Sequence, residues 1–224
     1  MNSLNQVKIL NRSVRRLIFA YKWHHNSGDK HGWAKGMDVV STALKDVKIL
    51  TPRRFGDARG FFRESWNQRA MASAGLDFQF VQDNESLSKD AGTLRGLHYQ
   101  APPHAQAKLV RVVRGAILDV AVDVRVGSPD YGKWISAEIT AENGAQILVP
   151  RGFLHGFVTL ESDTHVAYKA DGFYDFLSDG AVIWNDSTLA INWGVALDSV
   201  HLSDKDKQAP GFRDWTSPFI YEAA

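Results

Sequence analysis

The chain has 224 residues, with 26 Lys and Arg against 25 Asp and Glu and a hydrophobic fraction of 44%. This length fits one large or two small domains, and the near-zero net charge gives no overall indication of a nucleic-acid or membrane partner. The sequence has no cysteine, which excludes disulfides, thiolate catalysis and cysteine-based zinc sites.

The first 36 residues differ from the rest of the chain because they are basic and lack its alternating pattern. Residues 5–21 could form a short amphipathic helix, with Val7, Leu10 and Val14 near one face. The apolar run at 17–21 is too short for the core of a signal peptide or for a bilayer span, so we expect a cytoplasmic protein. We predict that residues 1–36 are a dispensable or disordered extension and that residues 37–224 form a single domain.

From Val39 onward, most segments have the pattern of β-strands. Residues 47–50 and 60–66 are expected to be extended, and a helix is expected over 67–74, with Asn67 as its N-cap and Gly75 at its end. Strand patterns follow at 78–84, 109–113, 116–124, 134–140, 146–149, 156–160 and 165–169. Many short strands with turn residues between them predict an all-β antiparallel sandwich or barrel, and the irregular tail after Trp193 should pack across its outside or mouth.

Three segments carry the clearest motifs. Residues 55–65 read Phe-Gly-Asp-Ala-Arg-Gly-Phe-Phe-Arg-Glu-Ser, residues 95–111 contain Arg-Gly-Leu-His-Tyr-Gln and Gln-Ala-Lys-Leu-Val-Arg, and residues 150–157 read Pro-Arg-Gly-Phe-Leu-His-Gly-Phe. The second sets His98 and Lys108 ten residues apart across a Pro-containing turn, so that a base and a cation could face one pocket. In this order, from about Asp46 to about Pro210, the chain resembles the dTDP-4-dehydrorhamnose 3,5-epimerase family of nucleotide-sugar enzymes.

The resemblance implies a double-stranded β-helix, a cupin-like jelly-roll barrel with a few short helices that encloses a ligand between its sheets. It also implies that His98 is the general base. Imidazole titrates near neutral pH, which suits proton abstraction, although a lone histidine at a strand end is more often structural. Asp206 matches the aspartate that orients this histidine, with Asp204 as the rival if the register slips by two residues.

The other implied catalytic residues are a lysine and a tyrosine. Lys108 would polarise a ketone and stabilise the enolate, as a preorganised cation does where negative charge develops; its alternative is a solvated charge at a strand end. Tyr168 would return a proton to the face opposite His98; by default a strand tyrosine packs in the core with its hydroxyl at the rim.

The remaining polar matches are implied ligands of a nucleotide diphosphate sugar: Arg59, Glu64, Gln82, Asn84, Arg95, His155, Tyr174, Asp179 and Lys205. Arg59 and Arg95 are the first pyrophosphate candidates because a guanidinium can donate two parallel hydrogen bonds. Tyr174 matches a ring that stacks on the ligand, with Phe173 beside it, and Phe61, Phe62 or Tyr131 could flank the base. Alternatively, Arg59 and Glu64 form a surface ion pair and Asn84 caps a turn.

The resemblance therefore predicts a homodimeric isomerase that inverts C3 and C5 of dTDP-4-dehydro-6-deoxy-D-glucose without metal or cofactor. A C3-only epimerase remains an alternative, since it would use the same base and donor. A metal-dependent cupin would need two or three histidines and a carboxylate at one ion, and His98, His104 and His155 lack the close His-x-His pair of such sites. A sugar-nucleotide-binding module without turnover would be expected to have lost the base, lysine or tyrosine.

Overall fold

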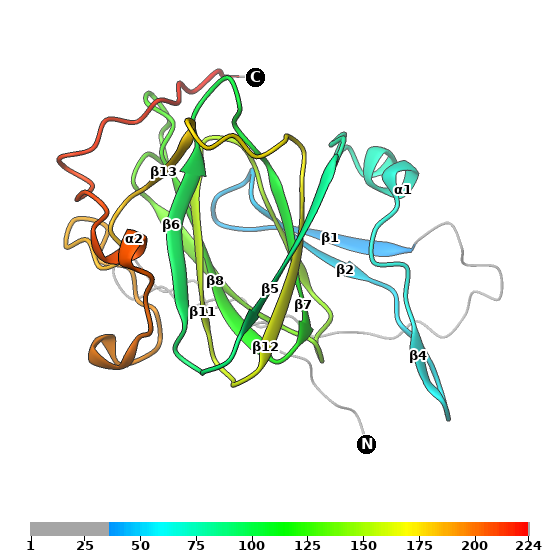
Figure 1. Ribbon diagram of the computed structural model, residues 1–224. Coiled ribbons are helices and arrows are strands. Elements are labelled where there is room, and N and C mark those ends of the chain that lie inside the picture. The colour runs from blue at the N-terminus through cyan, green and yellow to red at the C-terminus, as the bar shows by residue number, and fades with distance from the viewer. Residues whose placement is uncertain (1–35, 224) are drawn as a thin grey trace.

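The computed structural model describes residues 36–223, which form a sandwich of two antiparallel β-sheets (Figure 1). The six-stranded sheet has the order β1 (Met37–Ser41), β2 (Lys48–Pro52), β10 (Gln146–Val149), β7 (Lys108–Arg114), β12 (Thr164–Ala170) and β5 (Gln82–Ser88). The five-stranded sheet has the order β13 (Asp179–Ala181), β6 (Leu94–Gln100), β11 (Phe153–Thr159), β8 (Ala116–Asp123) and β9 (Trp134–Thr140). From β9 to β12 the chain alternates between the sheets, which is the jelly-roll barrel that the motifs implied.

The smaller elements are a hairpin and short helices. Strands β3 (Phe55–Asp57) and β4 (Gly60–Phe62) form the hairpin, which projects away from the sandwich in Figure 1. The helices are α1 (Gln68–Ser73), the 3₁₀ turn η2 (Leu197–Ser199) and α2 (Asp204–Lys207), which lies beside β6.

The central core lies between the sheets. It is built from every second side chain of each strand, because successive side chains point to opposite faces of a sheet. On β7, Val110 and Val112 enter this core, whereas Leu109 packs on the outer face of the six-stranded sheet. On β8, Ile117 and Ala121 face inward in the same way. The inner positions of both sheets are thus the ones that can face a ligand.

Both outer faces are partly covered by connecting segments. Met71 of α1 and the aromatic residues that follow it pack on the six-stranded sheet. Trp184, Trp193 and Phe219 pack on the five-stranded sheet, where the tail was expected to lie. The helix α2 and the segment before it lie beside β6.

The helix α1 begins as its sequence predicted, because the Asn67 side chain accepts a hydrogen bond from the Ala70 amide over 3.1 Å. The strand predicted at 78–84 was wrong in its bounds, since β5 begins at Gln82 and continues to Ser88. Phe78 and Phe80 do not join the sheet edge because they stack on each other, with ring centroids 6.0 Å apart, and pack beside Trp66. Strand β4 lies within the segment 60–66 that was predicted to be extended, whereas β3, β13 and α2 were not predicted.

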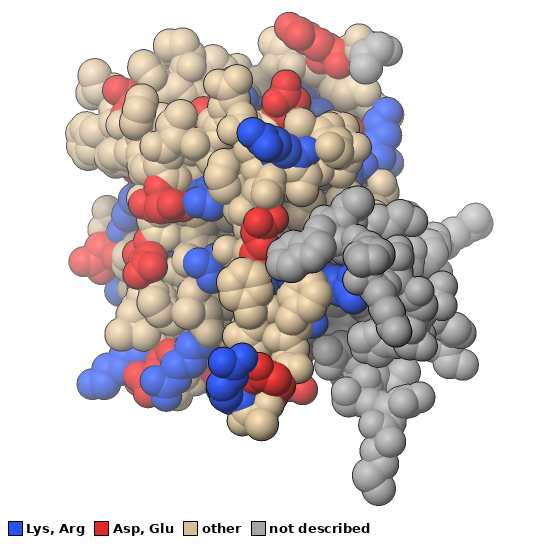
Figure 2. All heavy atoms as spheres, turned by 90° about the vertical axis from the view of Figure 1, so that its right-hand side faces the viewer, with Lys and Arg blue, Asp and Glu red and all other residues tan. Residues whose placement is uncertain are grey.

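The predicted helix at 5–21 lies outside the described residues, and the dispensability of residues 1–36 stays a prediction. Among residues 36–223, no helix is long and apolar enough to cross a membrane. On the face shown in Figure 2, Lys and Arg side chains lie among Asp and Glu side chains, in keeping with the balanced charge of the sequence.

Candidate active site

A cavity of about 560 Å³ opens between the two sheets. Residues that the motifs singled out contribute to its wall from both sides: Arg95, His98 and His155 from the five-stranded sheet, Lys108 and Tyr168 from the six-stranded sheet, and Asp206 from α2. Residues far apart in the sequence therefore meet in one cavity.

His98 is held by a carboxylate from the far end of the chain. Its Nε2 lies 2.5 Å from Oδ1 of Asp206. This pairing assigns the ring hydrogen to Nε2, so that Nδ1 keeps the free lone pair and can act as a base. A carboxylate in this position also stabilises the imidazolium that forms when the ring takes up a proton.

Asp206 is buried, with 2% of its surface exposed, because α2 turns it inward. Ser203 is the N-cap of α2, and its hydroxyl donates to Oδ2 of Asp206 over 2.8 Å. Burial alone would raise the pKa of Asp206, but the hydrogen bond and charge of His98, with Ser203, outweigh it and lower that pKa. The rival Asp204 is exposed and pairs with Lys207, so only Asp206 can orient His98 here.

Lys108 and Tyr168 face His98 from the opposite sheet. In the register of β7 and β12, Tyr168 pairs with Val110 and Lys108 with Ala170, so the two side chains are diagonal neighbours on the inner face. The Lys108 Nζ lies 5.9 Å from the centroid of the Tyr168 ring. Burial raises the pKa of Tyr168, which keeps the phenol protonated and able to donate.

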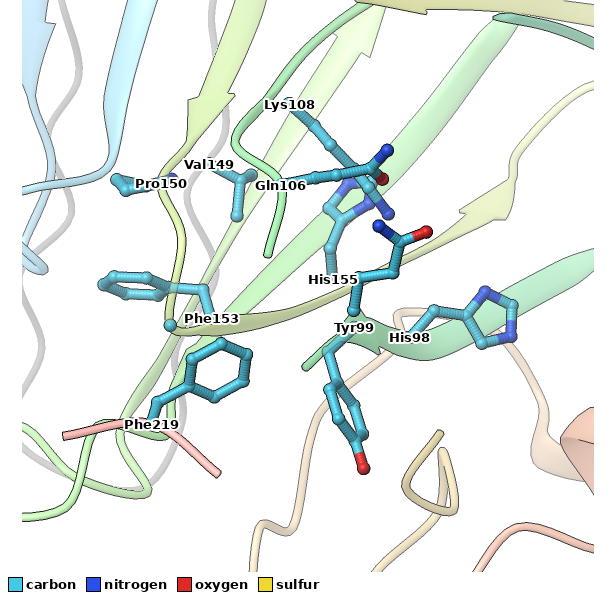
Figure 3. A pocket seen from close by; sticks show the side chains of 11 residues that line it. His98, Tyr99, Gln106, Lys108, Val149, Pro150, Phe153, His155 and Phe219 are labelled. Carbon is cyan, nitrogen blue, oxygen red and sulfur yellow. The ribbon is translucent and has the colours of Figure 1, made fainter. Parts of the chain in front are cut away.

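Behind Lys108 lies a second histidine–carboxylate pair that sequence reasoning missed. Asp119 is fully buried, and both of its carboxylate oxygens lie 2.9 Å from Nε2 of His155. Burial raises the pKa of Asp119, and the charges of His155 and Lys108 oppose that rise. Figure 3 shows His155 and Lys108 beside the same hollow, while Tyr99 points to the other side of β6.

The charge of Asp119 in turn affects the pKa of Lys108. Burial lowers the pKa of Lys108, and the negative charges of Asp179 and Asp119 oppose this. An acidic residue inside the otherwise apolar run Ala116–Val122 was the signal that could have identified Asp119, since an unpaired charge is rarely placed there.

Other residues implied as ligands pair with one another beside the cavity. Asp179 forms an ion pair with Lys205 and accepts a hydrogen bond from the Tyr174 hydroxyl over 3.3 Å. Gln82 donates to Asn84 over 3.0 Å and accepts from the Tyr174 amide over 2.9 Å. Asn84 therefore does not cap a turn but lies within β5.

Arg95 and Arg59 occupy very different places. Arg95 lines the cavity and reaches the Ser88 hydroxyl and the Leu87 carbonyl, each over 3.4 Å. Arg59 lies on the projecting hairpin with 90% of its side chain exposed, outside this cavity. The alternative that it pairs with Glu64 was wrong, because its partner is Asp57.

The remaining aromatic candidates lie at different places on the surface, and none of them lines the cavity. Phe61 and Phe62 are exposed on the hairpin with Arg59, and Phe173 is exposed next to Tyr174. Tyr131 packs against Phe212 with ring centroids 5.6 Å apart and is 39% exposed, and its place beside a nucleobase stays a prediction. Within residues 36–223, no group of three or more His, Asp or Glu side chains is arranged to hold a metal ion.

The geometry suits acid–base chemistry at carbon. A histidine base on one sheet and a phenol on the other can serve opposite faces of a molecule lying between them. The ammonium of Lys108, next to Tyr168, can stabilise negative charge that develops on a carbonyl oxygen when a neighbouring proton is removed. The site can therefore remove a proton from one face of a carbon next to a carbonyl and return one to the other face.

Comparisons with known proteins agree with this chemistry. A family model described as dTDP-4-dehydrorhamnose 3,5-epimerase matches residues 41–214. The curated dTDP-4-dehydrorhamnose 3,5-epimerase of Sinorhizobium fredii is 50% identical over 189 residues, which cover 83% of this chain and 94% of the relative.

Solved structures show the same similarity. The Bacillus anthracis dTDP-4-dehydrorhamnose 3,5-epimerase with TDP and PPi bound is 49% identical, with a TM-score of 0.76 over 79% of this chain and 99% of that one. The Legionella pneumophila dTDP-6-deoxy-D-glucose-3,5-epimerase in complex with dTDP-4-keto-L-rhamnose is 39% identical, with a TM-score of 0.79 over 84% of this chain and 100% of the other.

Proposed function

This chain belongs to the dTDP-4-dehydrorhamnose 3,5-epimerase family, a family of isomerases, and we propose that it converts dTDP-4-dehydro-6-deoxy-D-glucose to dTDP-4-dehydro-L-rhamnose. The observation that carries this proposal is the placement of the His98–Asp206 pair on one side of the cavity and Tyr168 with Lys108 on the other. We also propose a cytoplasmic location, which the absence of cysteine fits.

Each epimerisation needs two proton transfers. Nδ1 of His98 takes the proton from the carbon next to the C4 ketone, and the electrons of that bond move to the ketone oxygen to form an enolate. Lys108 holds the enolate oxygen by charge and hydrogen bonding. Tyr168 then delivers its phenolic proton to the opposite face, which inverts the carbon.

No further chemical group is required for this reaction. The ketone at C4 acidifies the hydrogens at both C3 and C5. One base and one donor can therefore serve both carbons, provided that His98 gives its proton to solvent and Tyr168 regains one from solvent while the sugar reorients. We therefore propose an enzyme that uses neither nicotinamide nor metal, and its activity should survive a chelator.

The first experiment follows deuterium by NMR while the purified protein acts on dTDP-4-dehydro-6-deoxyglucose in deuterated water, with and without chelator. We expect incorporation at both C3 and C5, unchanged by the chelator. Incorporation at C3 alone would select the C3-only epimerase, and binding without incorporation would select a binding module.

We further propose that the protein is a homodimer in which each hairpin completes the partner's site. The hairpin projects from its own subunit, and it carries the exposed rings of Phe61 and Phe62 beside Arg59. Leu87 and Val113 are exposed on the six-stranded sheet as well. Exposed apolar groups of this kind are typical of a protein interface. If Arg59 contacts a diphosphate, that ligand must lie in a second copy.

Mixed dimers test this arrangement directly. Arg59→Ala and His98→Ala homodimers should each be impaired, but their coexpressed mixture should recover about a quarter of the sites, because half of the dimers are mixed and each of these has one complete site. If Arg59 acts within its own subunit, coexpression will recover no activity. A monomer by light scattering would also reject the proposal.

A further inference from the structure

The loop between β12 and β13, residues 171–178, carries exposed apolar side chains and leads into Asp179, whose charge acts on Lys108 in the cavity wall. Phe173 is 70% exposed and Leu177 is 91% exposed, and Tyr174 and Phe176 are exposed between them. Tyr174 is tied to Asp179, one of the charges that act on Lys108. Exposed apolar side chains that gather on one loop are typical of a surface that receives a ligand or a partner, and binding residues often lie on loops.

The backbone of this loop is held by a buried side chain, that of Gln100. Its Nε2 donates to the Phe173 carbonyl over 3.2 Å and to the His104 carbonyl over 2.5 Å. Its Oε1 accepts from the Asp175 amide over 2.9 Å. The amide thus uses both of its donors and its acceptor, and Gln100 is only 5% exposed.

Two other glutamines hold the same loop at single points. Gln106 donates to the Gly172 carbonyl over 2.7 Å, and Gln82 accepts from the Tyr174 amide over 2.9 Å. Gln100 differs from them because its bonds to Phe173 and Asp175 bracket Tyr174. Losing Gln100 would therefore free the part of the loop that carries the rings.

Gln100 also connects the loop to the strand of the base. It lies two residues after His98 on β6, so both side chains point to the same face of the five-stranded sheet. Tyr99 between them packs on the opposite face. The loop and the base are thus both fixed to one short piece of rigid backbone.

We infer that Gln100 is a positioning residue: it holds Phe173 and Tyr174 in the conformation that receives the nucleotide and sets that nucleotide in register with His98. The inference rests on the proposed function, because it takes the ligand to be a nucleotide sugar. Its physical basis is preorganisation, since rings that are already fixed lose less conformational entropy when a nucleobase stacks on them.

The test replaces Gln100 by leucine, which has a similar size and no hydrogen-bonding groups. We expect the Kd for dTDP and the KM for the sugar nucleotide to rise about tenfold, because buried backbone groups lose their partners and the loop loosens. The kcat should change less than about twofold, since the reacting atoms are untouched. Gln79→Leu, at an exposed position before β5, is the matched control and should bind dTDP normally.

A double-mutant cycle separates positioning from general stability. If Gln100 acts through the rings, Gln100→Leu should weaken dTDP binding little further once Phe173 and Tyr174 are both alanine. Independent losses in the combined variant, an unchanged Kd in Gln100→Leu, or a fall in kcat as large as the rise in KM would each overturn the inference.

A second variant and a separate measurement of turnover complete the test. If Gln100→Leu does not fold, Gln100→Glu takes its place. The glutamate still accepts a hydrogen bond from the Asp175 amide, but its second carboxylate oxygen faces the Phe173 carbonyl and cannot donate to it. The cycle is measured by calorimetry with dTDP alone, whereas turnover of the wild-type protein is measured separately. A wild-type protein that binds dTDP without turnover would reject the proposed function, and the cycle would still decide the role of Gln100.

Discussion

Replacing His98 by alanine is expected to abolish deuterium exchange at both C3 and C5 and to lower turnover by about 10²- to 10⁴-fold, the usual contribution of a general base. His98 is the cavity-lining imidazole that Asp206 orients, whereas the His155 ring is bound to Asp119. The exchange is measured by NMR in deuterated water, with dTDP binding as the control for folding.

Tyr168→Phe is the informative contrast to His98→Ala. It removes the donor but leaves the base and Lys108 in place, so some exchange should persist while inversion slows. His98→Ala protein that exchanges at the wild-type rate would show that the base is another group. Tyr168→Phe protein that inverts normally would reject the phenol as the proton donor.

Replacing Lys108 by methionine is the second large effect, with an expected loss of about 10²- to 10³-fold in kcat, as for removal of one stabilising donor at a developing oxyanion. Methionine keeps much of the length of the chain but has no charge. Lys169→Met is the matched control, because Lys169 lies in the same sheet but pairs with Asp83 2.8 Å away, outside the cavity wall. It should retain kcat.

The pH dependence of kcat provides an independent test of the need for a charged Lys108. Since burial lowers the pKa of Lys108, its ammonium should lose its proton at a lower pH than a free lysine would. Turnover of the wild-type protein should therefore fall on the alkaline side as the cation is lost, and that fall should be absent from the residual activity of Lys108→Met. An unchanged alkaline limb in Lys108→Met would assign it to another group.

Local patterns in the sequence determined much of the scaffold. Alternation of apolar residues predicted strands such as β9 and β10 with their observed bounds, and Asn67 predicted the start of α1. These features depend on the order of nearby residues and on the fixed geometry of helices and strands, so they can be recognised in a single sequence. The motif around His98 also indicated the base and the cation from residues only ten positions apart.

The tertiary structure decided which groups meet. Asp206 reaches His98 across 108 positions, and it does so because Ser203 caps a four-residue helix that periodicity does not reveal. Asp119 reaches His155 because β8 and β11 are neighbours in the sheet. Arg59 lies outside the cavity that Arg95 lines because its hairpin projects. Such contacts depend on strand order and chain crossings, which arise from packing of the whole domain. The sequence alone therefore determined the chemical groups and the strands, and the packing of two sheets determined which groups share one cavity.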